Sequence, residues 1–156
     1  MVSQGAPAAS ADITINASPQ TVYGLITDLP TLAELAEETT AMTWHKGDSV
    51  RPGAVFKGAN RNGKKTWTTT CTITAATPGE VFAFDVHSAR VPVAHWRYDI
   101  VAADGGCRVT ESTWDNRPGW FAKIAGFATG VHDRLSVNAE HIDATLRRLK
   151  ARAENP

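Results

Sequence analysis

The chain has 156 residues, of which 42% are hydrophobic and 21% are charged, and its 16 basic residues are balanced by 16 acidic residues. This size and composition are typical of one globular domain and exclude an intrinsically disordered chain. The formal charge of zero gives no basic excess for nucleic acid or for an anionic membrane surface, so we expect neither as a partner. We expect residues 1–9 to form a disordered tail and residues 10–152 to form a single domain.

The sequence contains none of the short motifs that mark a metal, phosphate or nucleophile site. Cys71 and Cys107 lie far apart and form no CxxC or Cys/His motif, so we expect two buried thiols. We therefore predict no metal and no cofactor. No apolar stretch reaches 18 residues and residues 1–10 do not resemble a signal peptide, which predicts a cytoplasmic protein without stable membrane insertion.

The first elements are predicted from a change of period near Pro19. Apolar and polar residues alternate over residues 11–16, which is typical of a half-buried strand. Ser18 followed by Pro19 indicates a helix start, in which the serine caps the first turn. The segment 28–30, Asp-Leu-Pro, is expected to break this helix before a second one begins. Two short helices are thus predicted, at residues 19–27 and 31–38.

The middle of the chain is predicted to be an antiparallel meander. From residue 39 to residue 116 the period is 2, and turn residues recur at short intervals. Asn62-Gly63 and Asp104-Gly105 are the strongest hairpin signals, because these residues tolerate the dihedral angles of tight turns. Six strands are predicted, at residues 40–46, 54–61, 64–77, 80–88, 93–103 and 106–115. With the first strand they make a sheet of seven.

The end of the chain is predicted to be one long helix. After Pro118-Gly119 the helical period holds for about thirty residues, which is about 45 Å at 1.5 Å per residue. Its apolar face consists of Ile124, Phe127, Val131, Leu135, Ile142, Leu146 and Leu149. A helix of this length is expected to lie across the whole sheet.

Five local patterns carry a resemblance to a known family. They are Ala17-Ser18-Pro19-Gln20-Thr21-Val22-Tyr23, Phe56-Lys57-Gly58 with Asn60-Arg61-Asn62-Gly63, Pro78-Gly79-Glu80-Val81-Phe82-Ala83-Phe84, Trp96-Arg97-Tyr98, and Gly106-Cys107-Arg108-Val109-Thr110-Glu111. Over about residues 11–152 the chain resembles the START-like or SRPBCC superfamily, especially its polyketide cyclase/dehydrase and lipid-transport branch. The resemblance implies an α+β helix-grip fold of the Bet v 1-like type. In it a curved seven-stranded antiparallel sheet surrounds the long C-terminal helix, and two short helices lie between strands 1 and 2.

The resemblance also implies a cavity between sheet and helix, and the predicted inner face favours one. That face is rich in aromatic residues and includes the polar residues Asn60, Thr69 and Glu111. A filled core more typically interdigitates Leu, Ile and Val, whereas ligand sites combine apolar walls with a few polar groups. Gly126 and Gly130 remove side chains from the facing helix. The alternative is a filled core with one or two buried polar groups.

The leading hypothesis is that the protein binds or transports a hydrophobic small molecule, lipid or polyketide-like, in this cavity. Burial of apolar surface, at about 25 cal/mol per Å², would drive binding. The expected ligand-binding residues are Trp44, Phe56, Trp67, Thr69, Phe84, Trp96, Tyr98, Phe121, Phe127 and Ala128. The sequence does not identify a protein partner, although a third hypothesis is a surface that binds another protein.

The alternative hypothesis is an enzyme resembling aromatic polyketide cyclases and dehydratases, which would need an acid/base or orienting group beside a bound carbonyl. Glu111, His132 and Arg97 are the candidates. Glu111 falls on the inward face, where burial would raise its pKa, unless it reaches solvent or pairs with Arg97. His132 faces either the cavity or its rim, or is structural. His95 alternates with Trp96 and is expected to point outward.

Overall fold

The computed structural model describes residues 5–131 and 133–156. Seven strands form one antiparallel sheet in the order β1-β7-β6-β5-β4-β3-β2. They are β1 (Ala9–Ile15), β2 (Thr39–Lys46), β3 (Val55–Asn62), β4 (Lys65–Thr77), β5 (Val81–Ser88), β6 (Val91–Ala103) and β7 (Gly106–Asp115). The helices are α1 (Pro19–Ile26), α2 (Leu29–Leu35), α3 (Gly119–Thr129) and α4 (Arg134–Glu154). The predicted α+β fold, with two short helices after β1 and a long C-terminal helix on the sheet, is confirmed.

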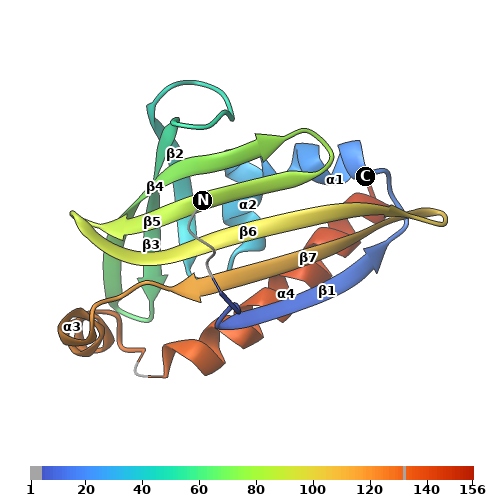
Figure 1. Cartoon of the computed structure of the whole chain (residues 1–156). Helices are drawn as coiled ribbons and strands as arrows, with labels where there is room; N and C mark the ends of the chain where they lie inside the picture. The colour runs from blue at the N-terminus through green and yellow to red at the C-terminus, as the bar shows by residue number, and fades with distance from the viewer. Residues whose placement is uncertain (1–4, 132) are drawn as a thin grey trace.

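The sheet is strongly bent. Register shifts interrupt β2, β4 and β6, and such irregularities bend a strand and increase its local twist. In Figure 1, β2 and β3 stand nearly upright while β6, β7 and β1 run across the view, and α4 lies behind the sheet. The sheet therefore curves around the side on which α4 packs.

The two short helices begin at capping residues. The Ser18 hydroxyl accepts a hydrogen bond from Thr21 N at 3.1 Å, as predicted for the start of α1. The prediction that residues 28–30 only break the chain is wrong. Asp28 caps α2 by accepting from Thr31 N at 3.2 Å, and Pro30 fits in the first turn because no N–H is needed there. The second helix therefore starts two residues earlier than predicted.

The prediction of one continuous C-terminal helix is also wrong. Gly130 has a φ of 74°, in the left-handed region that glycine adopts without strain, and it ends α3. A second helix, α4, begins at Arg134, where the side chain of Asp133 accepts from Ser136 N at 3.3 Å. In Figure 1 the short α3 lies apart from α4, at the edge of the molecule.

The filled part of the core lies where α4, α1 and the sheet meet. From Ile142 onward, α4 buries apolar side chains against the sheet, among them Ile142, Leu146 and Leu149, which are at most 1% exposed. They belong to one cluster with buried residues of α1, β1, β5 and β7, among them Ile15, Val22, Ile26, Phe82 and Val109. Cys71 and Cys107 are free and buried, as predicted, and burial raises the pKa of the Cys71 thiol to about 12.

Some residues assigned to the tail contact the sheet. Ala9 is the first residue of β1, and Ala8 N donates a hydrogen bond to Thr113 O at 2.8 Å. Nearer the start of the chain, Gly5 O accepts a hydrogen bond from Trp114 Nε1 at 3.1 Å.

In the part of the chain described, residues 5–131 and 133–156, no helix is long and apolar enough to cross a membrane.

Gly106 is the glycine whose replacement we expect to be most damaging. A Cβ atom there would lie 2.0 Å from Ile15 O and 2.9 Å from Ala17 N, so the backbone would have to move. We expect Gly106→Ala to lower the free energy of unfolding by about 3 kcal/mol or more. Urea unfolding followed by circular dichroism measures this change.

Gly24→Ala is the matched control, because a Cβ atom at this position of α1 meets no heavy atom within 4 Å. Alanine is the better helix former, so this variant should gain about 0.5–1 kcal/mol. Equal stability of the two variants would show that the close approach of β7 to the β1–α1 connection is not a constraint.

Candidate functional site

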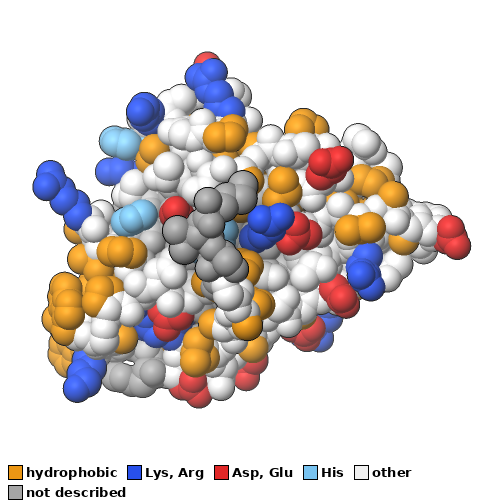
Figure 2. Space-filling model, in the orientation of Figure 1, with side chains coloured by type: hydrophobic (Ala, Val, Ile, Leu, Met, Phe, Trp, Pro, Cys, Tyr) orange, Lys and Arg blue, Asp and Glu red, His pale blue; other side chains and the backbone are white. Residues whose placement is uncertain are grey.

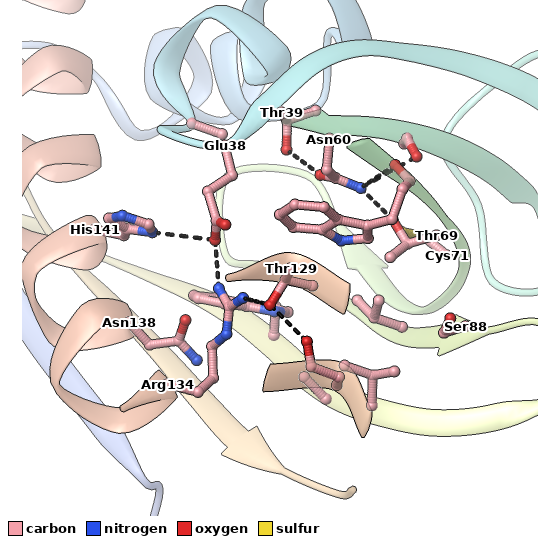
Figure 3. Close-up of a pocket in the computed structure, with 18 of the residues that line it drawn as sticks. Glu38, Thr39, Asn60, Thr69, Cys71, Ser88, Thr129, Arg134, Asn138 and His141 are labelled. Carbon is pink, nitrogen blue, oxygen red and sulfur yellow. Dashed lines mark hydrogen bonds and ion pairs between the residues drawn. The ribbon is translucent and has the colours of Figure 1, made fainter. Parts of the chain in front are cut away.

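A pocket of about 410 Å³ lies between the bent sheet, α3 and residues 134–145 of α4. It occupies the side of the sheet that α4 faces, away from the filled core. Its strand residues come from β2 to β7, for example Met42, Trp67, Phe84, Trp96 and Tyr98. Figure 3 shows this pocket, with polar side chains from α4 and from the β2–β4 wall facing across it. The hollow arises because α4 buries side chains against the sheet only from Ile142 onward.

Most of the residues predicted to bind a ligand lie in the pocket wall. Side chains two residues apart on a strand, such as Trp67 and Thr69 on β4 or Trp96 and Tyr98 on β6, point to the side of α4. The predicted residues that line the pocket are Trp67, Thr69, Phe84, Trp96, Tyr98, Phe121 and Ala128. The last two come from α3, which covers one side of the pocket.

Three of the predicted ligand-binding residues do not line the pocket. Phe56 is fully buried behind the wall, with its ring centroid 5.3 Å from that of Phe84. Trp44 lies in a separate, more open depression beside the start of α2. Phe127 is 76% exposed, and the Lys65 ammonium group lies 4.8 Å from its ring centroid. Phe127 points to solvent because α3 is a separate helix and does not continue the buried face of α4.

The candidate acid/base residues are not gathered at one place. Arg97 is absent from the pocket wall, and its Nε donates to both carboxylate oxygens of Asp99 at 3.0 Å. His132 lies outside the described residues. His95 points away from the pocket, as predicted, and its Nδ1 lies 2.6 Å from Asp85 Oδ1. Of the three candidates, Glu111 is the one that the structure places in the pocket wall.

Glu111 is paired with a tyrosine and not with Arg97. Its side chain is 3% exposed, and Tyr98 OH donates to its Oε1 at 2.8 Å. Its Oε2 is buried without a hydrogen-bond partner among the described residues. Burial raises the pKa of Glu111 to about 8, although the hydrogen bond from Tyr98 lowers it in part. Glu111 is therefore mostly a neutral carboxylic acid at pH 7.

An ionic cluster at the other wall was not predicted from the sequence. Arg134 Nη1 donates to Glu38 Oε1, and its Nη2 donates to Thr129 Oγ1 at 3.3 Å. His141 Nδ1 lies 3.6 Å from the same Glu38 oxygen. Figure 3 shows these side chains converging from α4, from the end of α3 and from the residue before β2. The cluster therefore connects three segments around the pocket.

The pocket-facing side of α4 is a polar stripe. Arg134, Asn138, His141 and Thr145 all line the pocket, at intervals of four, three and four residues. This is the helical period, so the signal was present in the sequence. It was missed because the sequence interpretation followed only the apolar residues of the helix.

The polar residues predicted on the inner face of β3 and β4 bind one another. Asn60 Nδ2 donates to Thr69 Oγ1 and to Gly58 O, both at 3.2 Å. Its Oδ1 accepts from Thr39 Oγ1 at 3.1 Å. A Cβ atom on Gly58 would lie 3.0 Å from Thr69 Oγ1, so glycine makes room for this contact. The amide of Asn60 is thus held in a fixed orientation at the wall.

The helix α3 is apolar on its outer side as well. Phe121, Ala125 and Ala128 line the pocket, whereas Trp120 and Phe127 are 62% and 76% exposed. Figure 2 shows hydrophobic side chains gathered at the edge of the molecule where α3 lies.

Two residues of the β3–β4 hairpin hold the C-terminal end of α3. Asn62 Nδ2 donates to Thr129 O at 2.9 Å, and Lys65 Nζ donates to Phe127 O.

No group of three or more His, Cys, Asp or Glu side chains within residues 5–131 and 133–156 could hold a metal ion.

The chain matches the family described as polyketide cyclase / dehydrase and lipid transport over residues 7–154, and it belongs to this family. The resemblance inferred from the sequence is thereby confirmed. Membership implies binding of a hydrophobic ligand, without naming the ligand. A search of curated proteins found no match.

Solved structures share the fold at low sequence identity. StfQ, a di-domain ARO/CYC from the steffimycin biosynthetic pathway, is 14% identical with a TM-score of 0.72, over 93% of this chain and 49% of that chain. The Polyketide_cyc-like protein Cgl2372 from Corynebacterium glutamicum is 22% identical with a TM-score of 0.62, over 94% and 91%. Ara h 8.0201 is 13% identical with a TM-score of 0.62, over 91% and 96%. At these identities the likeness shows the fold alone.

Glu111 should make the stability of the protein decrease as the pH rises. Its pKa is about 8 in the folded protein, against an ordinary value of 4.5. Between these values unfolding releases a proton, so the free energy of unfolding falls by up to about 1.4 kcal/mol per pH unit. We expect Glu111→Gln to lack this decrease between pH 5 and pH 8, measured by urea unfolding at each pH.

Tyr98→Phe serves as the control. Loss of the Tyr98 hydroxyl removes a hydrogen bond that favours the ionised carboxylate, so the pKa of Glu111 should rise. The decrease in the free energy of unfolding with pH should therefore extend above pH 8. Identical pH dependence in wild type and in Glu111→Gln would contradict a neutral buried Glu111.

Proposed function

We propose that the protein binds or carries a hydrophobic small molecule, lipid or polyketide-like, in the pocket between the sheet, α3 and α4. The observation that carries the proposal is the pocket itself. Its volume of about 410 Å³ falls within the roughly 300–1,000 Å³ of small-molecule sites, which are mainly apolar with a few placed polar groups. Membership of the family supports the same class of ligand.

The pocket walls supply both an apolar surface for the ligand and polar atoms that can orient it. Trp67, Phe84 and Trp96 offer aromatic area whose burial against a ligand is worth about 25 cal/mol per Å². Tyr98 and Glu111 place polar atoms within this apolar area. A ligand would therefore be held mainly by apolar contacts and would be oriented by a small number of hydrogen bonds.

Filling the pocket should abolish binding. Ala125 lines the pocket from α3, whereas Ala122, on the same helix, does not. We expect Ala125→Phe to weaken binding of the uncharged fluorescent probe N-phenyl-1-naphthylamine at least tenfold, because the phenyl group takes the space of the ligand. Ala122→Phe, the matched control, should bind as the wild type does, in fluorescence titrations of both variants.

Native mass spectrometry of gently purified wild type, incubated with an extract of its own cells, should show a retained hydrophobic compound. Equal probe binding by wild type and Ala125→Phe, with no retained compound, would rule out the pocket as the ligand site.

An alternative function is a polyketide cyclase/dehydratase-like enzyme that uses the same pocket. The observation in its favour is the neutral carboxylic acid of Glu111 within an apolar wall. Glu111 would donate a proton to a ketone oxygen of a bound poly-β-keto chain while an enol carbon attacks the ketone carbon. The resulting carboxylate would take the proton that the enol oxygen releases, which restores the acid. Tyr98 would hold the carboxyl group in position.

The two functions differ in what Glu111→Gln does. For the enzyme, this variant should keep its affinity for a short poly-β-ketone and lose turnover by about 10²–10⁴, the usual contribution of a general acid/base. Product formation by liquid chromatography and affinity by calorimetry measure the two quantities. Turnover equal to that of the wild type would exclude Glu111 as the acid/base, and a wild type without turnover would leave the carrier function.

A further inference from the structure

The basic groups of the pocket wall all face acidic partners. Arg117 and Arg134 are its two guanidinium groups in the described part of the chain. Arg134 donates to Glu38, and Arg117 donates to Asp115 through Nε and Nη2, each at 2.9 Å. The imidazole of His141 lies 3.6 Å from the Glu38 oxygen that Arg134 binds. An anionic ligand would therefore find no unpaired cation among these groups.

Carboxyl groups, in contrast, exceed the cations. Four of them line the pocket: Glu37, Glu38, Glu111 and Asp115. Glu37 is bound from outside by Arg148, at 2.7 Å. The Oε2 atoms of Glu38 and Glu111 are buried and have no hydrogen-bond partner in the described residues. These two carboxyl oxygens are buried polar atoms of the wall whose hydrogen bonding a ligand can complete.

The Oε2 atoms of Glu111 and Glu38 can form hydrogen bonds with different groups of a ligand. Because Tyr98 OH donates to Glu111 Oε1, the proton of the neutral acid lies on Oε2 and can be donated to a carbonyl or hydroxyl oxygen. Glu38 is bound on one oxygen by Arg134, so its other oxygen can accept from a hydroxyl group. The ligand that satisfies both oxygens carries an acceptor and a donor, and no negative charge.

We propose that the pocket selects uncharged amphiphiles bearing hydroxyl or carbonyl groups and rejects carboxylate, sulfate and phosphate amphiphiles. This inference rests on the proposed function and adds the class of ligand. An anionic head group would be buried without a counter-ion and close to the carboxylate of Glu38, which is costly in an apolar site. A hydroxyl or carbonyl group instead supplies partners that the buried oxygens lack.

The test compares ligands that differ only in the head group. Calorimetric titration at pH 7 uses 2-naphthol against 2-naphthoate, and 1-decanol against decanoate. We expect the wild type to bind the neutral member of at least one pair at least tenfold more tightly than the anionic member. Glu38→Gln should raise the affinity for the anionic member about tenfold, because Arg134 is then free to pair with it.

Glu34→Gln is the matched control. Glu34 is exposed and pairs with Arg152 outside the pocket, so this variant removes the same charge without freeing Arg134. Its preference should equal that of the wild type. Wild type that binds these compounds without a tenfold preference for the neutral member in either pair would overturn the inference and leave the proposed function intact. Wild type that binds none of the four compounds would overturn the proposed function, and the inference with it.

Discussion

The apolar contact that α4 makes, from Ile142 onward, with the sheet and α1 is the interaction on which the other features depend. Ile142, Leu146 and Leu149 are buried in one cluster with residues of β1, β5 and β7. This cluster holds α4 on the sheet from Ile142 onward, so the turns before Ile142 need not pack against the sheet. The hollow beneath these turns is therefore compatible with a stable fold, because the stabilising apolar burial is concentrated elsewhere.

The polar groups of the pocket are expensive to bury, and their pairing explains how the protein tolerates them. Asn60 is satisfied by Thr39, Thr69 and Gly58, and Arg134 by Glu38 and Thr129. Glu111 avoids the cost of a buried charge by keeping its proton, since burial raises its pKa. The polar atoms that these contacts leave without a hydrogen bond define which groups a ligand can contribute. Stability and ligand preference thus depend on the same few atoms.

The sequence predicted the sheet and most of its inner face because strand alternation is a local signal, and Trp96, Tyr98 and Glu111 lie on the side that the period of 2 assigns to them. It failed at Gly130, because glycine is tolerated within helices and only the backbone shows the left-handed conformation that separates α3 from α4. Phe127 was misplaced for the same reason. The pairing of Glu38 with Arg134 joins residues 96 positions apart, and no local pattern encodes such a contact.

The hydrogen bonds from Asn62 and Lys65 to the carbonyl groups of α3 make the β3–β4 hairpin and this helix one mechanical unit. Gly63 and Lys64, which form the turn of the hairpin, touch no part of the pocket. An inserted or deleted residue in that turn would nevertheless shift the helix and resize the hollow. A change in the length of this hairpin turn could thus adapt the pocket to larger or smaller ligands without any substitution in its wall.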